Sequence, residues 1–332
     1  MPDVPDEDYR VVLGEESLDW RGLTDAQLER VLAALGDLLE PLADGRKVAF
    51  METAYDTECL PSMTLTDALY SPDGGLPPDE RRRLQSLLDK CRMVTAGEDD
   101  IPQPVRPGSE TEWREPSWGM SHALARAATG RAMSCLVATA EASDGSFSSK
   151  WPPGWLSVER CRDTSSDRVN LHVLTEHREA ADFWRGVLTR EHAPEVEFFR
   201  LVDVAFPRLL FADSLRFHHF KGAYVDVLPW LVGFLGLLND QFPETLELCG
   251  GDQKKVQARF KAMKADISPE SANTKKNAKA WEQRNVVFGG QSYRCEWHGK
   301  RLWDRDRVHF SLPIRAHGDR VLVGIFTGHL ST

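Results

Sequence analysis

The sequence lacks the signatures of membrane and secreted proteins. Its longest apolar run, residues 227–238, is well short of the about twenty residues that a membrane span needs. The acidic, proline-rich start, residues 1–8, does not resemble a signal or transit peptide. The six cysteines are scattered and form no Cys-x-x-Cys pair, so we expect reduced thiols. These absences predict a cytoplasmic protein without a membrane partner.

Signatures of common enzymes are absent too. Gly250-Gly251-Asp252 is not followed by the Gly-Lys-Ser/Thr of a phosphate-binding loop, and no Gly-x-Ser-x-Gly elbow is present. The sequence therefore leaves open whether the protein is an enzyme, and it predicts no cofactor.

What the sequence has is a separation of charge. The chain carries a formal net charge of −10, yet residues 251–332 hold 16 Lys/Arg against 8 Asp/Glu. Residues 1–100 hold 23 Asp/Glu against 10 Lys/Arg. Basic surfaces often bind polyanions, and acidic surfaces dock on basic ones. We expect nucleic acid to bind the C-terminal part and a protein partner to bind the acidic N-terminal part.

Apolar periodicity and turn residues predict an α+β protein in three parts. Residues 1–95 alternate strands and helices and indicate a small α/β domain. Residues 96–207 indicate a mixed α/β middle region with Pro-rich linkers, the first at 95–118. Residues 208–332 indicate a basic domain of helices packed on an antiparallel meander.

Within the last part, Ser268-Pro269-Glu270-Ser271 predicts the start of a helix, because proline favours the first helical turn. Strands are predicted at 285–297, 307–312 and 320–326.

Lysines are dense between the predicted helices and the meander. Lys275 and Lys279 are four residues apart, so one helix would present them on one face. Several cations on one face suit phosphate binding, whereas a solvated helix surface is the alternative. The predicted nucleic-acid-binding residues are Lys254, Lys255, Lys261, Lys275, Lys276, Lys279 and Arg301.

Aromatic residues lie among these charges and can stack on unpaired bases, although core packing is the better interpretation for most. They are Trp281, Tyr293, Trp297, Trp303 and Phe310.

Two metal sites can be considered, and neither is predicted. Cys295 and His298, with His309 and His329, have a spacing that suits zinc poorly, because positions 295 and 298 of a strand face opposite ways. In the N-terminal part, Glu52 and Asp56 follow a predicted strand, where α/β enzymes collect metal ligands. Ordinary loop charge explains this pair better.

Residues 208–332 resemble the RelE/HigB-type bacterial toxin fold. That family runs strand, two helices and a three-stranded meander; the counterparts here are 208–212, the helices between 214 and 240, and the predicted strands. The resemblance implies ribonuclease activity without a metal, in which a basic group stabilises the phosphorane-like charge and another moves the 2′-hydroxyl proton. A basic insertion at about 241–284 and the lack of a C-terminal Tyr depart from the family. The catalytic candidates are Lys300, Arg305, Arg307, His309 and His329.

Three functions follow as hypotheses. The first is a bacterial effector that binds RNA more readily than DNA and cuts it, in phage defence or a toxin–antitoxin-like system. If so, the Arg307/His309 face must be open to solvent. The second is a non-enzymatic nucleic-acid- or partner-binding component of a defence or regulatory assembly. The third is a metal-dependent enzyme that uses Glu52 and Asp56.

Overall fold

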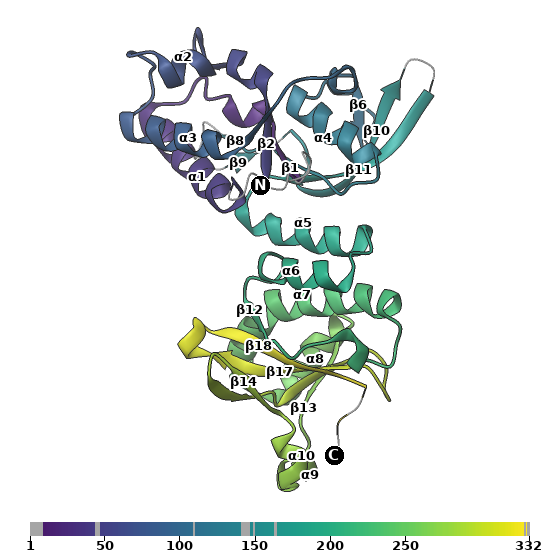
Figure 1. Ribbon diagram of the computed structural model, residues 1–332. Coiled ribbons are helices and arrows are strands. Elements are labelled where there is room, and N and C mark those ends of the chain that lie inside the picture. The colour runs from purple at the N-terminus through teal and green to yellow at the C-terminus, as the bar shows by residue number, and fades with distance from the viewer. Residues whose placement is uncertain are drawn as a thin grey trace, which may run out of the picture. The chain divides into compact units, whose positions relative to one another are not determined.

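The computed structural model describes residues 9–43, 47–108, 110–140, 147–148, 150–162, 165–328 and 330. The chain forms two compact units, Met1–Phe183 (unit 1) and Trp184–Thr332 (unit 2) (Figure 1). Both units combine helices with sheets, so the predicted α+β class is confirmed.

Unit 1 is organised around a seven-stranded sheet with the order β5-β2-β1-β7-β11-β10-β6. The strands from β5 to β11 pair in parallel, and β10 and β6 complete the sheet as antiparallel strands. The strands are β1 (Val11–Leu13), β2 (Val48–Met51), β5 (Arg92–Val94), β6 (Val105–Pro107), β7 (Ser134–Leu136), β10 (Gly154–Arg162) and β11 (Ser165–Leu174).

One face of this sheet is packed against α4 (Trp118–Ala128), which begins after Ser117. The Ser117 hydroxyl accepts a hydrogen bond from the Met120 backbone and caps the helix. Met120 and Leu124 then pack into one core cluster with Val12 of β1. The remaining helices of unit 1 are α1 (Asp25–Ala43), α2 (Leu65–Tyr70) and α3 (Pro78–Lys90), and the short strand pairs are β3 (Glu58–Leu60) with β4 (Met63–Thr64) and β8 (Thr139–Ala140) with β9 (Phe147–Ser148).

The sheet differs from the predicted division at residue 95. Strand β1, the middle strand of the five parallel ones, pairs with β2 on one side and with β7, from the predicted middle region, on the other. The predicted linker at 95–118 contains β6, where Val105 is buried and pairs with Arg160. Residues 1–95 and the following region are therefore one folded unit, because the hydrogen bonds of β1 are shared between them.

Unit 2 contains a five-stranded sheet with the order β12-β18-β17-β16-β13 and a separate β14–β15 hairpin. β12 pairs in parallel with β18, and the other neighbours are antiparallel. The strands are β12 (Leu209–Phe211), β13 (Asp266–Pro269), β14 (Asn285–Phe288), β15 (Gln291–Arg294), β16 (Trp297–Lys300), β17 (Arg307–Ile314) and β18 (Arg320–Thr327). Helix α5 (His177–Arg190) contains the boundary between the units, and the helices of unit 2 after it are α6 (Glu195–Ala205), α7 (Tyr224–Leu248), α8 (Gln253–Ala262), α9 (Ala272–Lys276) and α10 (Ala278–Glu282).

One face of the unit 2 sheet packs against α7. The Phe242 ring meets the rings of Trp297 and Phe310 at centroid distances of 5.5 and 5.0 Å. Gly299 leaves room for the Phe234 ring: a Cβ there would lie within 2.8 Å of Cε1 and closer still to two other ring atoms. The alternate residues of β16 and β17 face away from α7 and carry the polar side chains described below.

Three predicted elements of unit 2 differ in the structure. The single strand predicted at 285–297 is instead the antiparallel β14–β15 hairpin followed by the first residue of β16. Residues 214–240 hold a 3-10 turn at Phe217–His219 and then the single helix α7, rather than two helices. Asp266–Pro269 is a strand, and the helix begins only after Ser271, whose side chain caps α9. Pro269 is compatible with β13 because this is an edge strand, where a missing N–H costs little. Among the described residues, no helix has the length and apolar character needed to cross a membrane.

Candidate functional site

The β16–β17 hairpin (residues 297–314, the Trp303 hairpin) holds four of the five predicted catalytic residues, Lys300, Arg305, Arg307 and His309, together with Arg301. Lys300 lies directly opposite Arg307 in the strand register. The loop between the strands is closed by backbone hydrogen bonds from Arg301 to Asp306 (2.9 Å) and from Leu302 to Arg305 (3.3 Å). The predicted residues between 300 and 309 therefore share one short structural element.

Asp306 holds this loop in place. It is fully buried, adopts a left-handed backbone conformation (φ 58°), and accepts hydrogen bonds from the backbone of Lys221 (2.7 Å) and Gly222 (3.2 Å). Its other oxygen pairs with Arg301 at 3.3 Å. Arg301 is therefore engaged within the protein, whereas Arg305 is exposed.

Trp303 is 84% exposed at the tip of the loop. The other aromatic candidates separate as follows: Trp297 and Phe310 are buried, and Trp281 and Tyr293 are partly buried. Core packing thus accounts for two of the five. A large apolar ring that is exposed to water contributes no core packing to the fold. Of the five aromatic candidates, Trp303 is therefore the one whose ring is available to a ligand.

The predicted lysines are exposed, but they do not share one helix. Lys254, Lys255 and Lys261 lie on α8. Lys275 and Lys276 end α9, whereas Lys279 lies in α10; Asn277 ends the first helix and caps the second. The expected common helical face of Lys275 and Lys279 is therefore absent, because the chain breaks between them.

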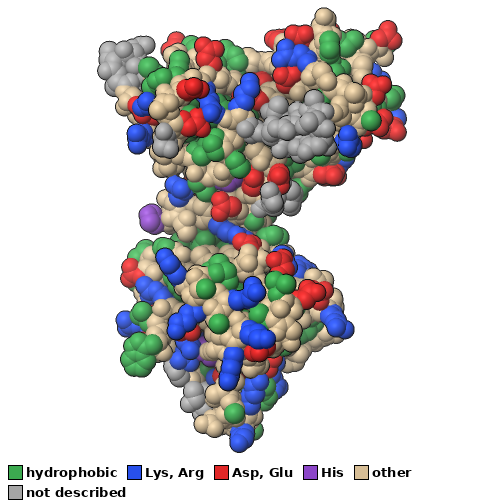
Figure 2. Space-filling view, turned by 180° about the vertical axis from the view of Figure 1, so that it is seen from behind, with side chains coloured by type: hydrophobic (Ala, Val, Ile, Leu, Met, Phe, Trp, Pro, Cys, Tyr) green, Lys and Arg blue, Asp and Glu red, His purple; other side chains and the backbone are tan. Residues whose placement is uncertain are grey.

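Lys275 already has partners within unit 2. Its ammonium lies 3.5 Å from the Glu296 carboxylate and 5.5 Å from the centre of the Trp281 ring. Arg294 lies over the same ring at 4.5 Å. Figure 2 shows Lys and Arg side chains distributed over the face of unit 2 that it presents. Unit 2 holds 22 Lys/Arg against 17 Asp/Glu, a net charge of +5, whereas unit 1 carries −15.

His309 does not lie on an open face. It is fully buried, and Arg307 beside it is partly buried. His309 lies opposite His298 in the register of β16 and β17, with ring centroids 5.1 Å apart. The ribonuclease hypothesis requires the Arg307/His309 face to be open to solvent. Only Arg307 is partly exposed, so this requirement is met in part.

Glu270 joins the two histidines from the end of β13. Its Oε1 lies 3.2 Å from Nδ1 of His298 and 3.2 Å from Nδ1 of His309. In neither approach is the ring N–H aligned for a hydrogen bond, so Oε1 and both Nδ1 atoms are buried without a hydrogen-bond partner. Nε2 of His309 has none either.

The other atoms of this cluster are fixed. Arg284, itself buried, donates to Oε2 of Glu270 (3.2 Å) and to the Ala280 carbonyl (2.6 Å). Nε2 of His298 lies 3.1 Å from the Ser268 hydroxyl. One side of the Glu270 carboxylate and one side of the His298 ring are therefore held, and their remaining atoms point to each other and to His309.

Burial sets the protonation of the two rings. It lowers the pKa of His309 to about 4 and also lowers the pKa of His298, so both rings are neutral near pH 7. Burial raises the pKa of Glu270, but the contacts with His298 and His309 outweigh it, and the net pKa lies below the ordinary value. The cluster thus offers a carboxylate and two neutral imidazoles.

The metal arrangements considered from sequence are different from this one. The buried Cys295 thiol lies near the Leu322 carbonyl, 4.0 Å away, and is not part of the cluster. Glu52 accepts a hydrogen bond from Thr95 (3.1 Å), and neither it nor Asp56 belongs to a group of three potential metal ligands among the described residues. His329 lies outside the described residues.

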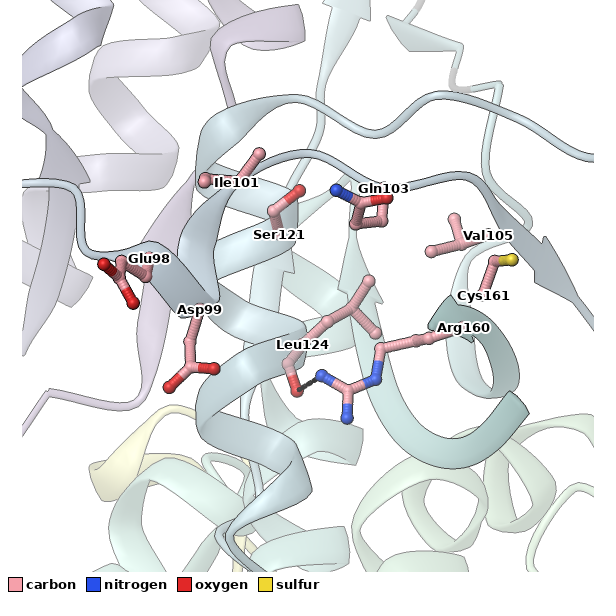
Figure 3. A pocket seen from close by; sticks show the side chains of 9 residues that line it. All are labelled: Glu98, Asp99, Ile101, Gln103, Val105, Ser121, Leu124, Arg160 and Cys161. Carbon is pink, nitrogen blue, oxygen red and sulfur yellow. Dashed lines mark hydrogen bonds between the residues drawn. The ribbon is translucent and has the colours of Figure 1, made fainter. Parts of the chain in front are cut away.

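Unit 1 has its own concave feature, a pocket of about 260 Å³ beside α4 (Figure 3). Arg160 lines it and donates to the Leu124 carbonyl at 3.4 Å, while pairing with Asp167 at 2.5 Å. Glu98 and Asp99 lie on another side of the pocket. With its one cation already paired, the pocket offers no evident anion site.

The carboxyl ends of the parallel strands are also occupied. Glu15, just after β1, accepts hydrogen bonds from the backbone of Gly119 at the start of α4 (2.8 Å) and from Thr53 (3.2 Å). The N-terminus of α4, where an anion could otherwise bind, is therefore occupied by a carboxylate of the protein itself.

No family model, curated protein or solved structure matches this chain. The RelE/HigB-type resemblance therefore stays a prediction, and function has to be argued from the geometry above.

Sequence reasoning missed Glu270 and Arg284 as partners of the histidines. The signal that was present is the alternation of polar residues in Arg307-Val308-His309-Phe310-Ser311, which marks one polar face of a strand. The residue that completes the cluster, Glu270, directly follows β13, and only the β13–β16 register places it there.

Proposed function

We propose that the protein binds single-stranded nucleic acid, RNA in preference to DNA, through the Trp303 hairpin and the basic surface of unit 2. The observation that carries this proposal is the indole of Trp303, 84% exposed at the tip of a loop beside the exposed Arg305. Lys300 and Arg307 lie opposite each other in neighbouring strands at the base of the same loop. Aromatic side chains next to cations stack on unpaired bases while the cations contact phosphates.

The burial of His309 favours binding without cleavage. A group that moves the proton of a 2′-hydroxyl has to come within about 3 Å of it, and a side chain with no exposed surface cannot do so without rearrangement. The non-enzymatic binding component is therefore the preferred form of the proposal. We place it in a bacterial defence or regulatory assembly, in which the acidic unit 1, with net charge −15, recruits a basic partner.

The test is fluorescence anisotropy of the full-length protein with labelled single-stranded RNA and DNA over a series of salt concentrations. Trp303→Ala should weaken binding by about 1–3 kcal/mol, since this is the usual contribution of one stacked base. The matched control is Trp113→Ala, which removes another exposed tryptophan, 44% exposed, from the acidic unit. It should leave affinity unchanged.

A second variant tests the electrostatic part. Replacing Lys275, Lys276 and Lys279 with Gln should flatten the dependence of log K on log salt, by about 0.7 for each phosphate of a single strand that the variant no longer neutralises. Parallel gels with and without EDTA should show intact RNA. Equal binding by the parent, the triple variant and Trp303→Ala would refute the proposal; cleavage that persists in EDTA would restore the ribonuclease hypothesis.

A further inference from the structure

We propose that Glu270, His298 and His309 bind one divalent transition-metal ion of the zinc class. One ligand atom from each residue lies within 4.8 Å of those of the other two, and all three side chains are buried. The ligands come from the end of β13, from β16 and from β17, so the sheet itself fixes their spacing.

A plain hydrogen-bonded cluster does not account for the geometry. If the rings were donors, each Nδ1–H would point at Oε1 of Glu270, yet neither is aligned with it. His309 in addition leaves both ring nitrogens without a hydrogen-bond partner although it has no exposed surface. Burying such groups unpaired is costly, and an ion that receives the lone pairs of Oε1 and of the two Nδ1 atoms removes that cost at three of these four atoms.

Two of the three residues, His298 and Glu270, have the second partner that metal ligands usually have. A ligating histidine usually donates its other N–H to a neighbour, and Nε2 of His298 has the Ser268 hydroxyl at 3.1 Å. A ligating carboxylate is likewise held on its second oxygen, and Arg284 holds Oε2 of Glu270. Both contacts leave Nδ1 and Oε1 for the ion.

The donor set indicates the kind of metal. Two imidazoles and one carboxylate suit zinc and neighbouring divalent ions and do not suit magnesium or calcium, which prefer oxygen. Three protein ligands leave a fourth tetrahedral position for a small ligand. Because Arg284 already balances the charge of Glu270, that fourth ligand should be an anion such as hydroxide or chloride.

The experiment uses the full-length protein, stripped with a chelator and then titrated with Zn²⁺ or Co²⁺. The parent should bind one ion per chain, raise its thermal midpoint with Zn²⁺, and give the intense visible bands of four-coordinate Co²⁺ without sulfur charge transfer, since Cys295 is not a ligand. His298→Asn and the double variant His298→Asn/His309→Asn should lose the ion. The matched control, His218→Asn/His219→Asn, removes two adjacent exposed histidines and should keep it.

Circular dichroism of each variant separates a loss of binding from a loss of folding. A folded parent that binds no stoichiometric Zn²⁺ or Co²⁺ would overturn the proposal, and this measurement needs no variant. Binding that survives in His298→Asn but disappears in the His218/His219 variant would overturn it too, because it would place the ion elsewhere. None of these readouts involves nucleic acid, so the result is independent of the proposed function.

Discussion

Replacing Gly299 with alanine should destabilise unit 2 specifically. Gly299 lies in the middle of β16, on the face covered by α7, and a Cβ there would overlap the Phe234 ring. That ring has no room to retreat: it is 4% exposed, stacks on Trp230 at 5.6 Å and meets Phe310 at 6.1 Å. Either the ring or the strand must move.

Overpacking of this kind costs about 1–3 kcal/mol, and the depth of the overlap places Gly299→Ala at about 2–3 kcal/mol. In a unit of this size, each kcal/mol of lost stability lowers the thermal midpoint by about 2–4 °C. The midpoint of the unit 2 transition should therefore fall by about 5–10 °C in calorimetry. The unit 1 transition should not move.

Two further variants make the reasoning refutable. Gly233→Ala adds a methyl group at an exposed position of α7 with no atom within 4 Å, and it should stabilise by about 0.5–1 kcal/mol. In the Gly299→Ala background, Phe234→Leu should restore part of the lost stability, because the smaller side chain leaves room for the new methyl group. In the parent, the same change creates a cavity and destabilises. A Gly299→Ala loss below about 0.5 kcal/mol, or no coupling between the two sites, would show that β16 and α7 are not packed as described.

Two other predictions concern buried groups. Asp306→Ala should destabilise unit 2 by about 1–3 kcal/mol in chemical denaturation, because the Lys221 and Gly222 amides lose their acceptor. Asp306→Asn keeps an acceptor oxygen and should cost clearly less. Equal losses of stability in the two variants would contradict the role given to the Asp306 oxygen. In the native protein, a thiol reagent should modify Cys161, and Cys249 more slowly, before any other cysteine; reaction of more than two thiols per chain without unfolding would contradict the burial of the rest. Burial raises the pKa of the other thiols, to about 11 at Cys59 and about 12 at Cys91 and Cys295, and well above the ordinary value at Cys135.

Local signals in the sequence predict local structure well. The apolar period and the cap at Thr24 predict α1, and the alternation in 155–161 and 169–174 predicts the antiparallel pair β10–β11. The terminal strands β17 and β18 also lie where expected. Each of these elements is specified by residues that are neighbours along the chain.

Features that depend on distant residues were not predictable. Nothing near β1 indicates that its second partner is β7, and the Pro-rich stretch before α4 has the composition of a linker although β6 within it completes the sheet. The same holds for the buried cluster: Glu270 looked like part of a helix start, and only the register of an edge strand sets it against His298 and His309. The basic side chains could be recognised from the sequence because charged residues are mostly exposed whatever the strand pairing is. The exposure of Trp303, in contrast, depends on a loop geometry that Asp306 fixes.

The position of β1 between β2 and β7 has a consequence for synthesis on the ribosome. Leu13 pairs with Leu136, about 120 residues later, and at about 5–20 residues per second the ribosome needs several seconds to make that partner. During this interval β1 and β2 can pair, but the other edge of β1 stays open, with Val11, Val12 and Leu13 available to any strand that meets them. The nascent N-terminal third is therefore an aggregation-prone species with a defined lifetime. Its dense negative charge, 23 acidic residues in the first hundred, would keep neighbouring nascent chains apart until β7 arrives.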